Sequence, residues 1–145
     1  MASQPLVLDT NIVLDLFVFA DDAARPVRTA LEGDGVRWVA THAMRDELER
    51  VLAYAQIAPR LAFHRLSAPD VLAIFDRHSQ QVEVPAKAPV TCKDPDDQKF
   101  IDLAVAHQAT LLSKDRAVLA LKKRLMALSV YVDTCLPIFK NRSCL

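Results

Sequence analysis

The chain has 145 residues, 52% of them hydrophobic and 25% charged, which is typical of one globular domain and excludes a disordered chain. Eighteen basic and eighteen acidic residues cancel, so a nucleic-acid partner would have to bind a local basic patch. The two glycines, Gly33 and Gly35, share one predicted turn, which excludes a glycine-rich phosphate loop and a dinucleotide-binding motif.

In chain order, the hydrophobic periodicity predicts short strands that alternate with longer helices. The expected segments are a strand at residues 6–8, a helix at 12–19, a helix from 21 to about 31, a strand at 36–40, a helix from 41 to about 55, helices at 59–66 and 68–80, a strand at 82–84, a proline-rich connector at 85–95, a helix at 96–107, a strand at 110–113, a helix at 117–126 and a strand at 130–132. This alternation favours a parallel sheet flanked by helices.

Local signals support this organisation. Asp21–Asp22 are suited to capping the second helix and Thr41 the third. We expect residues 1–145 to form a single domain with a core at about 5–133, followed by a loosely ordered tail at 137–145.

The cysteines and the N-terminus indicate the compartment. Cys92, Cys135 and Cys144 are odd in number and lack metal-ligand spacing, which is typical of reduced residues in a cytosolic protein. No signal-peptide pattern precedes the first strand, and no apolar run approaches the ~20 residues of a membrane span. We therefore expect a cytoplasmic protein without membrane contact.

Two aspartates directly follow predicted strands. Asp9 follows the strand at 6–8, and Asp115 follows the strand at 110–113. Ligands of open parallel sheets bind at the carboxyl ends of the strands. The two carboxylates should therefore lie close together if these strands are neighbours.

Helical spacing selects two further acids. Glu47 lies between Met44 and Val51 on the apolar face of its helix, where a carboxylate is costly unless it has a partner. Asp97 precedes Phe100 by three residues and so shares the buried face of its own helix, at the end that favours negative charge.

Together these four carboxylates predict a metal site. Each alone is more often a helix cap or a surface group, and Glu47 could also pair with an arginine. Four converging acids, however, imply bound cations, and oxygen ligands suit Mg²⁺ or Mn²⁺. Such ions activate water and stabilise the leaving oxygen in phosphodiester hydrolysis.

The order of these motifs resembles the PIN domain family. The resemblance rests on Leu-Val-Leu-Asp-Thr-Asn at 6–11, Arg-Asp-Glu-Leu at 45–48, Asp-Pro-Asp-Asp-Gln-Lys-Phe at 94–100 and Leu-Leu-Ser-Lys-Asp at 111–115. It covers about residues 6–132, and the Asp-Pro-Asp-Asp segment is similar to the branch that contains toxins of toxin–antitoxin systems.

This resemblance implies a three-layer α/β/α fold and a Mg²⁺- or Mn²⁺-dependent endoribonuclease. It further implies an RNA substrate, an antitoxin partner and a homodimer formed by the helices around 57–75. The residues that match the family's acidic positions, as metal ligands and catalytic groups, are Asp9, Glu47, Asp97 and Asp115. Supporting positions are Asn11 and Ser113, with Asp94 and Asp96 as candidate peripheral ligands.

Several basic residues are candidate RNA contacts. Lys114 departs from the family pattern and is expected to contact a phosphate or to reduce charge repulsion. Weaker candidates are Arg116, Lys122 and Lys123, because a charged run on a helix is more often a solvated face.

Two other functions compete with the nuclease. A phosphatase of the aspartyl-phosphate type would need a second aspartate two residues after Asp9, where the chain has Asn11, so this reaction is disfavoured. A PIN-like module that binds RNA or protein without catalysis stays open, since a fold does not guarantee activity.

Overall fold

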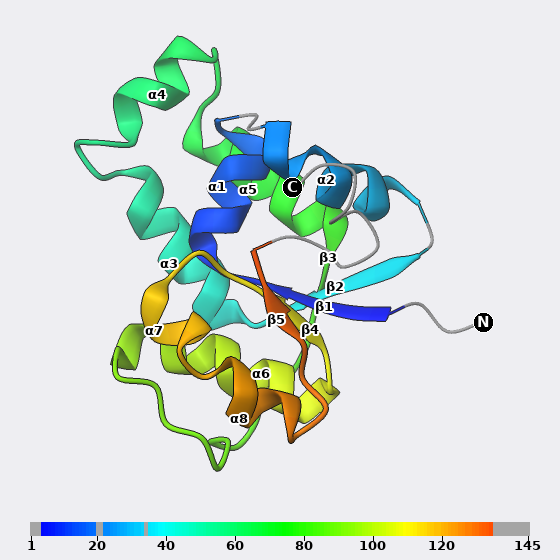
Figure 1. Ribbon diagram of the computed structural model, residues 1–145. Helices are drawn as coiled ribbons and strands as arrows, with labels where there is room; N and C mark the ends of the chain where they lie inside the picture. The colour runs from blue at the N-terminus through cyan, green and yellow to red at the C-terminus, as the bar shows by residue number, and fades with distance from the viewer. Residues whose placement is uncertain (1–3, 20–21, 34, 135–145) are drawn as a thin grey trace.

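The computed structural model describes residues 4–19, 22–33 and 35–134 and has one five-stranded sheet between two layers of helices (Figure 1). The strand order is β3-β2-β1-β4-β5, and all four pairings are parallel. The strands are β1 (Gln4–Leu8), β2 (Val36–Ala40), β3 (Ser79–Gln81), β4 (Thr110–Leu112) and β5 (Val132–Asp133). The predicted three-layer α/β/α fold is confirmed.

The helices cover both faces of the sheet, as helical crossovers between parallel strands require. One layer contains α1 (Thr10–Phe17), α2 (Arg25–Glu32), α3 (His42–Leu52), α4 (Ala58–Phe63) and α5 (Ala68–His78). The 3₁₀ turn η1 (Asp22–Ala24) lies between α1 and α2. The other contains the 3₁₀ turn η2 (Pro95–Asp97), α6 (Gln98–His107), α7 (Arg116–Leu119) and α8 (Lys122–Met126). In Figure 1, α4 projects furthest from the sheet.

The central strands are continuous apolar runs because both of their faces are covered. Leu6 and Val7 of β1 and Leu111 of β4 are fully buried. Trp38 of β2 is also buried, and its ring meets that of Phe75 from α5 edge-to-face at a centroid distance of 4.9 Å. This packing makes the sheet a rigid support for its carboxyl edge.

The expected strand at 82–84 is wrong. β3 instead begins at Ser79, immediately after α5, and Trp38 pairs with Ser79 and Ala40 with Gln81. The side chain of Val84 is 58% exposed. The apolar spacing was therefore misleading, because the edge strand β3 buries little and has a polar sequence.

The single helix expected at 117–126 is divided into α7 and α8. The amide of Leu121 donates to the carbonyl of Val118 at 3.0 Å, three residues back instead of four. This tight turn interrupts the helix although the apolar periodicity continues through it.

Other element boundaries also differ from the expectation. Thr41 occupies the position before α3 but makes no side-chain capping bond, and α3 ends at Leu52 rather than near residue 55. Asp22 does not cap α2; it lies in η1 and pairs with Arg25. The expectations for Asp21, the tail at 137–145, Cys135 and Cys144 lie outside the described residues, whereas Cys92 is buried with a free thiol.

The sheet register brings the chemically important segments together. Leu8 of β1 pairs with Leu112 of β4, so Asp9 and Ser113 follow at the same carboxyl edge. The two strands are thus neighbours, which is the condition under which Asp9 and Asp115 were expected to lie close together. No helix among the described residues has the length and apolar character of a membrane span.

Candidate functional site

Asp9 is fixed at the carboxyl edge by its neighbour in β4. The Ser113 hydroxyl, which is fully buried, donates to Asp9 Oδ2 at 2.6 Å. The Ser113 oxygen in turn accepts from the amide of Asp115 at 3.0 Å. One serine therefore orients both loops that carry the candidate carboxylates.

Asp9 and Asp115 also begin helices. Asp115 Oδ1 accepts from the amide of Ala117 at 2.8 Å and caps α7. Asp9 Oδ1 accepts from the amide of Asn11 at 3.4 Å at the start of α1. Each carboxylate therefore has a structural role as a cap. Both oxygens of Asp9 accept a hydrogen bond, one from Asn11 and one from Ser113, whereas Asp115 uses only Oδ1 in its cap.

Asp97, in contrast, does not cap a helix with its side chain. It lies at the start of α6 without a side-chain capping bond, and it is 8% exposed. Its Oδ2 atom is buried and has no hydrogen-bond partner among the described residues. A buried polar atom without a partner is costly, and its retention points to a ligand.

Asp97 and two other acids form a cluster. Asp94, Asp97 and Asp115 each offer a carboxylate oxygen, and these three atoms lie within 4.8 Å of one another. Asp94 reaches this position from the turn before η2, where its Oδ1 accepts from the amide of Asp96 at 3.0 Å. Carboxylate oxygens at this spacing fit a hard divalent cation such as Mg²⁺ or Mn²⁺.

The electrostatics of the site favour a bound cation. Burial, the negative charge of Asp9, a side-chain hydrogen bond with Asp115 and the negative charges of Asp115 and Asp94 raise the pKa of Asp97 to about 8. Burial is also the main cause of the raised pKa of Asp9, which the bond from Ser113 partly opposes. A cation would remove this repulsion and favour the ionised carboxylates.

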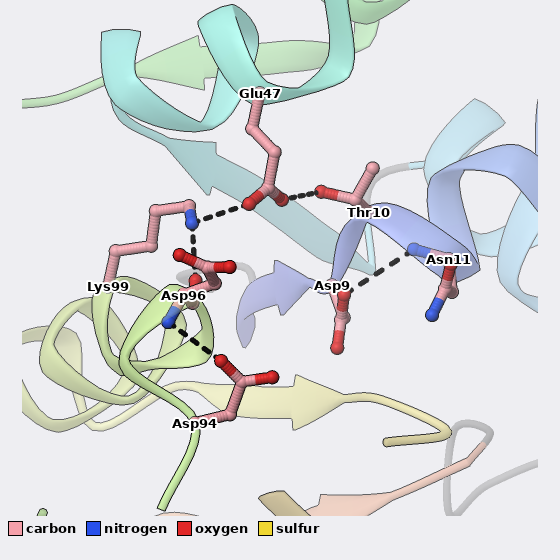
Figure 2. A network of polar contacts seen from close by, with 7 residues as sticks. All are labelled: Asp9, Thr10, Asn11, Glu47, Asp94, Asp96 and Lys99. Carbon is pink, nitrogen blue, oxygen red and sulfur yellow. Dashed lines mark hydrogen bonds and ion pairs between the residues drawn. The ribbon is translucent and has the colours of Figure 1, made fainter. Parts of the chain in front are cut away.

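Glu47 is not one of the three clustered acids. It has its own partners, Lys99 and Thr10 (Figure 2). The Lys99 ammonium lies 2.6 Å from Glu47 Oε1, and the Thr10 hydroxyl donates to Oε2. Glu47 was expected on the inward face of its helix, and its side chain is only 16% exposed and is paired. The partner is a lysine from α6, not an arginine.

The remaining candidates lie around the rim. Lys114 forms an ion pair with Asp15 of α1, a buried acid, which supports the charge-reducing role. The side chain of Lys122 is 4.0 Å from Asp133 and lies over the Tyr131 ring. The candidates that are exposed are Asn11, Asp96, Arg116 and Lys123.

Sequence reasoning missed Thr10, Asp15 and Lys99. One signal pointed to Lys99, because a glutamate on an apolar helical face requires a partner. That rule does not name the partner, since Glu47 and Lys99 are 52 residues apart and meet when α3 and α6 are placed by the sheet.

Ser113→Ala is expected to destabilise the fold by about 1–3 kcal/mol, because it leaves a buried Asp9 oxygen and the Asp115 amide without their partner. Chemical denaturation measures this loss. Ser113→Thr keeps the hydroxyl and should recover most of the stability. Equal stability of wild type and Ser113→Ala would show that the serine does not organise the site.

Comparison with known proteins agrees with this geometry. A family model for the PIN domain matches residues 5–117. A solved structure, described as VapBC2 from Rickettsia felis bound to a DNA fragment from its promoter, contains a similar chain. The two chains are 14% identical with a TM-score of 0.58, over 89% of this chain and 98% of the other. No protein of curated function matches. Because the PIN domain model matches residues 5–117, which is most of the chain, the chain belongs to the PIN domain family.

Proposed function

We propose that the protein is a metal-dependent endoribonuclease that hydrolyses phosphodiester bonds at the carboxyl edge of its sheet. The observation that carries this proposal is the unpartnered, buried Asp97 oxygen within a group of three carboxylates. Membership of the PIN family supports a nuclease rather than another metal-dependent hydrolase. The cofactor is Mg²⁺ or Mn²⁺.

The proposed roles follow from the contacts. Asp94, Asp97 and Asp115 would hold the cation, and Asp9, fixed by Ser113, would complete the negative site. The bound ion would lower the pKa of a water and stabilise charge on the phosphate oxygens. Glu47, paired with Lys99, would face the substrate from the other side of the site.

Cleavage of a mixed single-stranded RNA pool tests this proposal. Purified protein should cut RNA with Mg²⁺ or Mn²⁺, and excess chelator should stop the reaction. Asp46→Asn is a matched control, because Asp46 is an exposed carboxylate beside Glu47; this variant should cut at the wild-type rate. Cleavage that persists in chelator would contradict the metal-dependent mechanism.

Arg116→Ala is expected to weaken RNA binding several-fold, because Arg116 is exposed and directly follows Asp115. For a single strand, the loss of one phosphate contact should flatten the plot of log Kd against log salt by about 0.7. Fluorescence anisotropy at several salt concentrations measures both effects. Arg77→Ala is the control, since Arg77 precedes the amino end of β3 and the site lies at the carboxyl ends of the strands. An equal loss of RNA binding in Arg77→Ala would contradict the proposed contact of Arg116.

We further propose that this nuclease is the toxin of a toxin–antitoxin pair, acts in the cytoplasm and binds an antitoxin protein. The support is the similarity to a chain of the VapBC2 complex and the acidic Asp-Pro-Asp-Asp segment. A small neighbouring reading frame whose product co-purifies with the protein and blocks RNA cleavage would support this role; cleavage unaffected by that product would contradict it.

The surface of α4 is proposed to form a homodimer. Phe63 of α4 is 80% exposed, and Tyr54, in the segment between α3 and α4, is 47% exposed. An exposed apolar patch is typical of a protein interaction site. Phe63→Ser should therefore shift the molar mass measured by light scattering from dimer to monomer. A wild-type protein that is monomeric at high micromolar concentration would contradict this assembly.

A further inference from the structure

Lys99 is held in one position by three contacts. Its ammonium lies 2.6 Å from Glu47 Oε1 and donates to the carbonyl of Asp96. It also lies 5.0 Å from the centroid of the Phe100 ring. The lysine side chain is 25% exposed and the glutamate side chain 16% exposed, so water screens this pair less than a surface ion pair.

These contacts satisfy Glu47 without a metal ion. One carboxylate oxygen is bound by the Lys99 ammonium and the other by the Thr10 hydroxyl (Figure 2). The situation at Asp97 is the opposite, since its buried Oδ2 has no hydrogen-bond partner in the described part of the chain. The acidic group around Asp97 therefore has no positive partner among the described residues, whereas Glu47 is already paired with the Lys99 ammonium.

We propose that this site binds one divalent cation, through Asp94, Asp97 and Asp115, and that Lys99 supplies the second positive charge at Glu47. This inference rests on the proposed nuclease function and deepens it, because a nuclease can also use two ions for these charges. It assigns Lys99 a catalytic role and makes Glu47 the residue that positions it.

The donor count of an ammonium group supports a contact with substrate. Lysine offers three N–H donors, and Glu47 and the Asp96 carbonyl use two of them. The third can bind an oxygen of the substrate phosphate. A fixed ammonium then stabilises the charge that grows on the phosphate during hydrolysis, and it does so without reorganising.

The number of Mn²⁺ ions bound per chain tests this assignment. Free Mn²⁺ can be counted by electron paramagnetic resonance during titration of the RNA-free protein. We expect one ion for wild type, one for Glu47→Gln and none for Asp97→Asn. Two ions in wild type, or loss of the ion in Glu47→Gln, would overturn the proposal.

Variants of Lys99 test its role separately from metal binding. Lys99→Ala should keep one Mn²⁺ ion but cut RNA at least about 100-fold more slowly, the scale of one lost transition-state contact. Lys99→Arg should recover part of the rate, because it restores a cation. Lys93→Ala, which removes an exposed charge next to Asp94, should keep both the ion and the rate. Cleavage by Lys99→Ala at the wild-type rate would overturn the catalytic role of Lys99.

The two proposals fail in different ways. If wild type binds one ion that Glu47→Gln retains, but cuts no RNA, the ion count is supported and the nuclease function is contradicted. If wild type cuts RNA and binds two ions, the nuclease function stands and the assignment of Lys99 is wrong. Thermal unfolding of each variant confirms that the compared proteins are folded.

Discussion

Asp97→Asn should abolish RNA cleavage and at the same time stabilise the metal-free protein. The loss of rate is expected to be at least about 1,000-fold, because the variant removes a proposed ligand from the cation site. The gain in unfolding free energy near pH 7, on the order of 2 kcal/mol, is expected because folded Asp97, whose pKa is raised to about 8, must hold a proton that the unfolded chain releases, whereas an asparagine side chain needs none. Single-turnover kinetics and denaturant unfolding measure the two effects.

The opposite signs make this prediction specific. A residue that merely supports the fold would lose stability and activity together when it is replaced. The same assays on Asp46→Asn should change neither quantity, because Asp46 is exposed. An Asp97→Asn protein that is less stable than wild type would show that Asp97 is a structural group.

The unfolding free energy of the metal-free protein should fall as pH rises from about 4 to about 8. Over this interval folded Asp97, whose pKa is raised to about 8, retains a proton that the unfolded chain releases near the ordinary value of 3.8. The folded state therefore binds more protons, and stability falls with pH. The raised pKa of Asp9 acts in the same direction. Melting curves across this range measure the slope, and Asp97→Asn should reduce it.

Added Mn²⁺ should oppose this fall of the unfolding free energy with pH. Because the ion binds ionised carboxylates, it displaces the proton from Asp97, and its stabilising effect should grow with pH up to about 8. At a free ion concentration of 100 times Kd, linkage predicts a gain of about 2.7 kcal/mol. Equal shifts in Tm at pH 6 and pH 8 would contradict displacement of a proton by the metal.

The sequence predicted the elements on which the site depends. The apolar runs of β1 and β4 are short but buried where they end, so their carboxyl ends, and with them Asp9 and Asp115, could be placed from the sequence pattern. The start of α6 was similarly marked by its apolar face, which separated Asp97 from Asp96. The edge strand β3 was misplaced because its residues, Ser79–Gln81, carry no apolar alternation.

The pairing of side chains could not be predicted in the same way. Lys99 and Glu47 come from helices far apart in the sequence, and helical spacing says which face a residue occupies but not what lies opposite. From the sequence, Asp94 was only a candidate peripheral ligand, and its role as a cap was not predicted. It in fact caps η2 and contributes an oxygen to the acidic group. The Asp94 cap is a local contact with Asp96, whereas the Lys99–Glu47 pair and the three-acid cluster depend on tertiary packing.

The most direct measurement is the cleavage of a single-stranded RNA pool by purified wild-type protein with Mn²⁺, beside Asp97→Asn, with bound Mn²⁺ counted in the same samples. We predict cleavage and a bound ion in wild type and neither in the variant. Bound Mn²⁺ without cleavage would contradict the nuclease and favour a module that binds RNA or protein without catalysis. A wild-type protein that binds no Mn²⁺ would contradict the metal site itself.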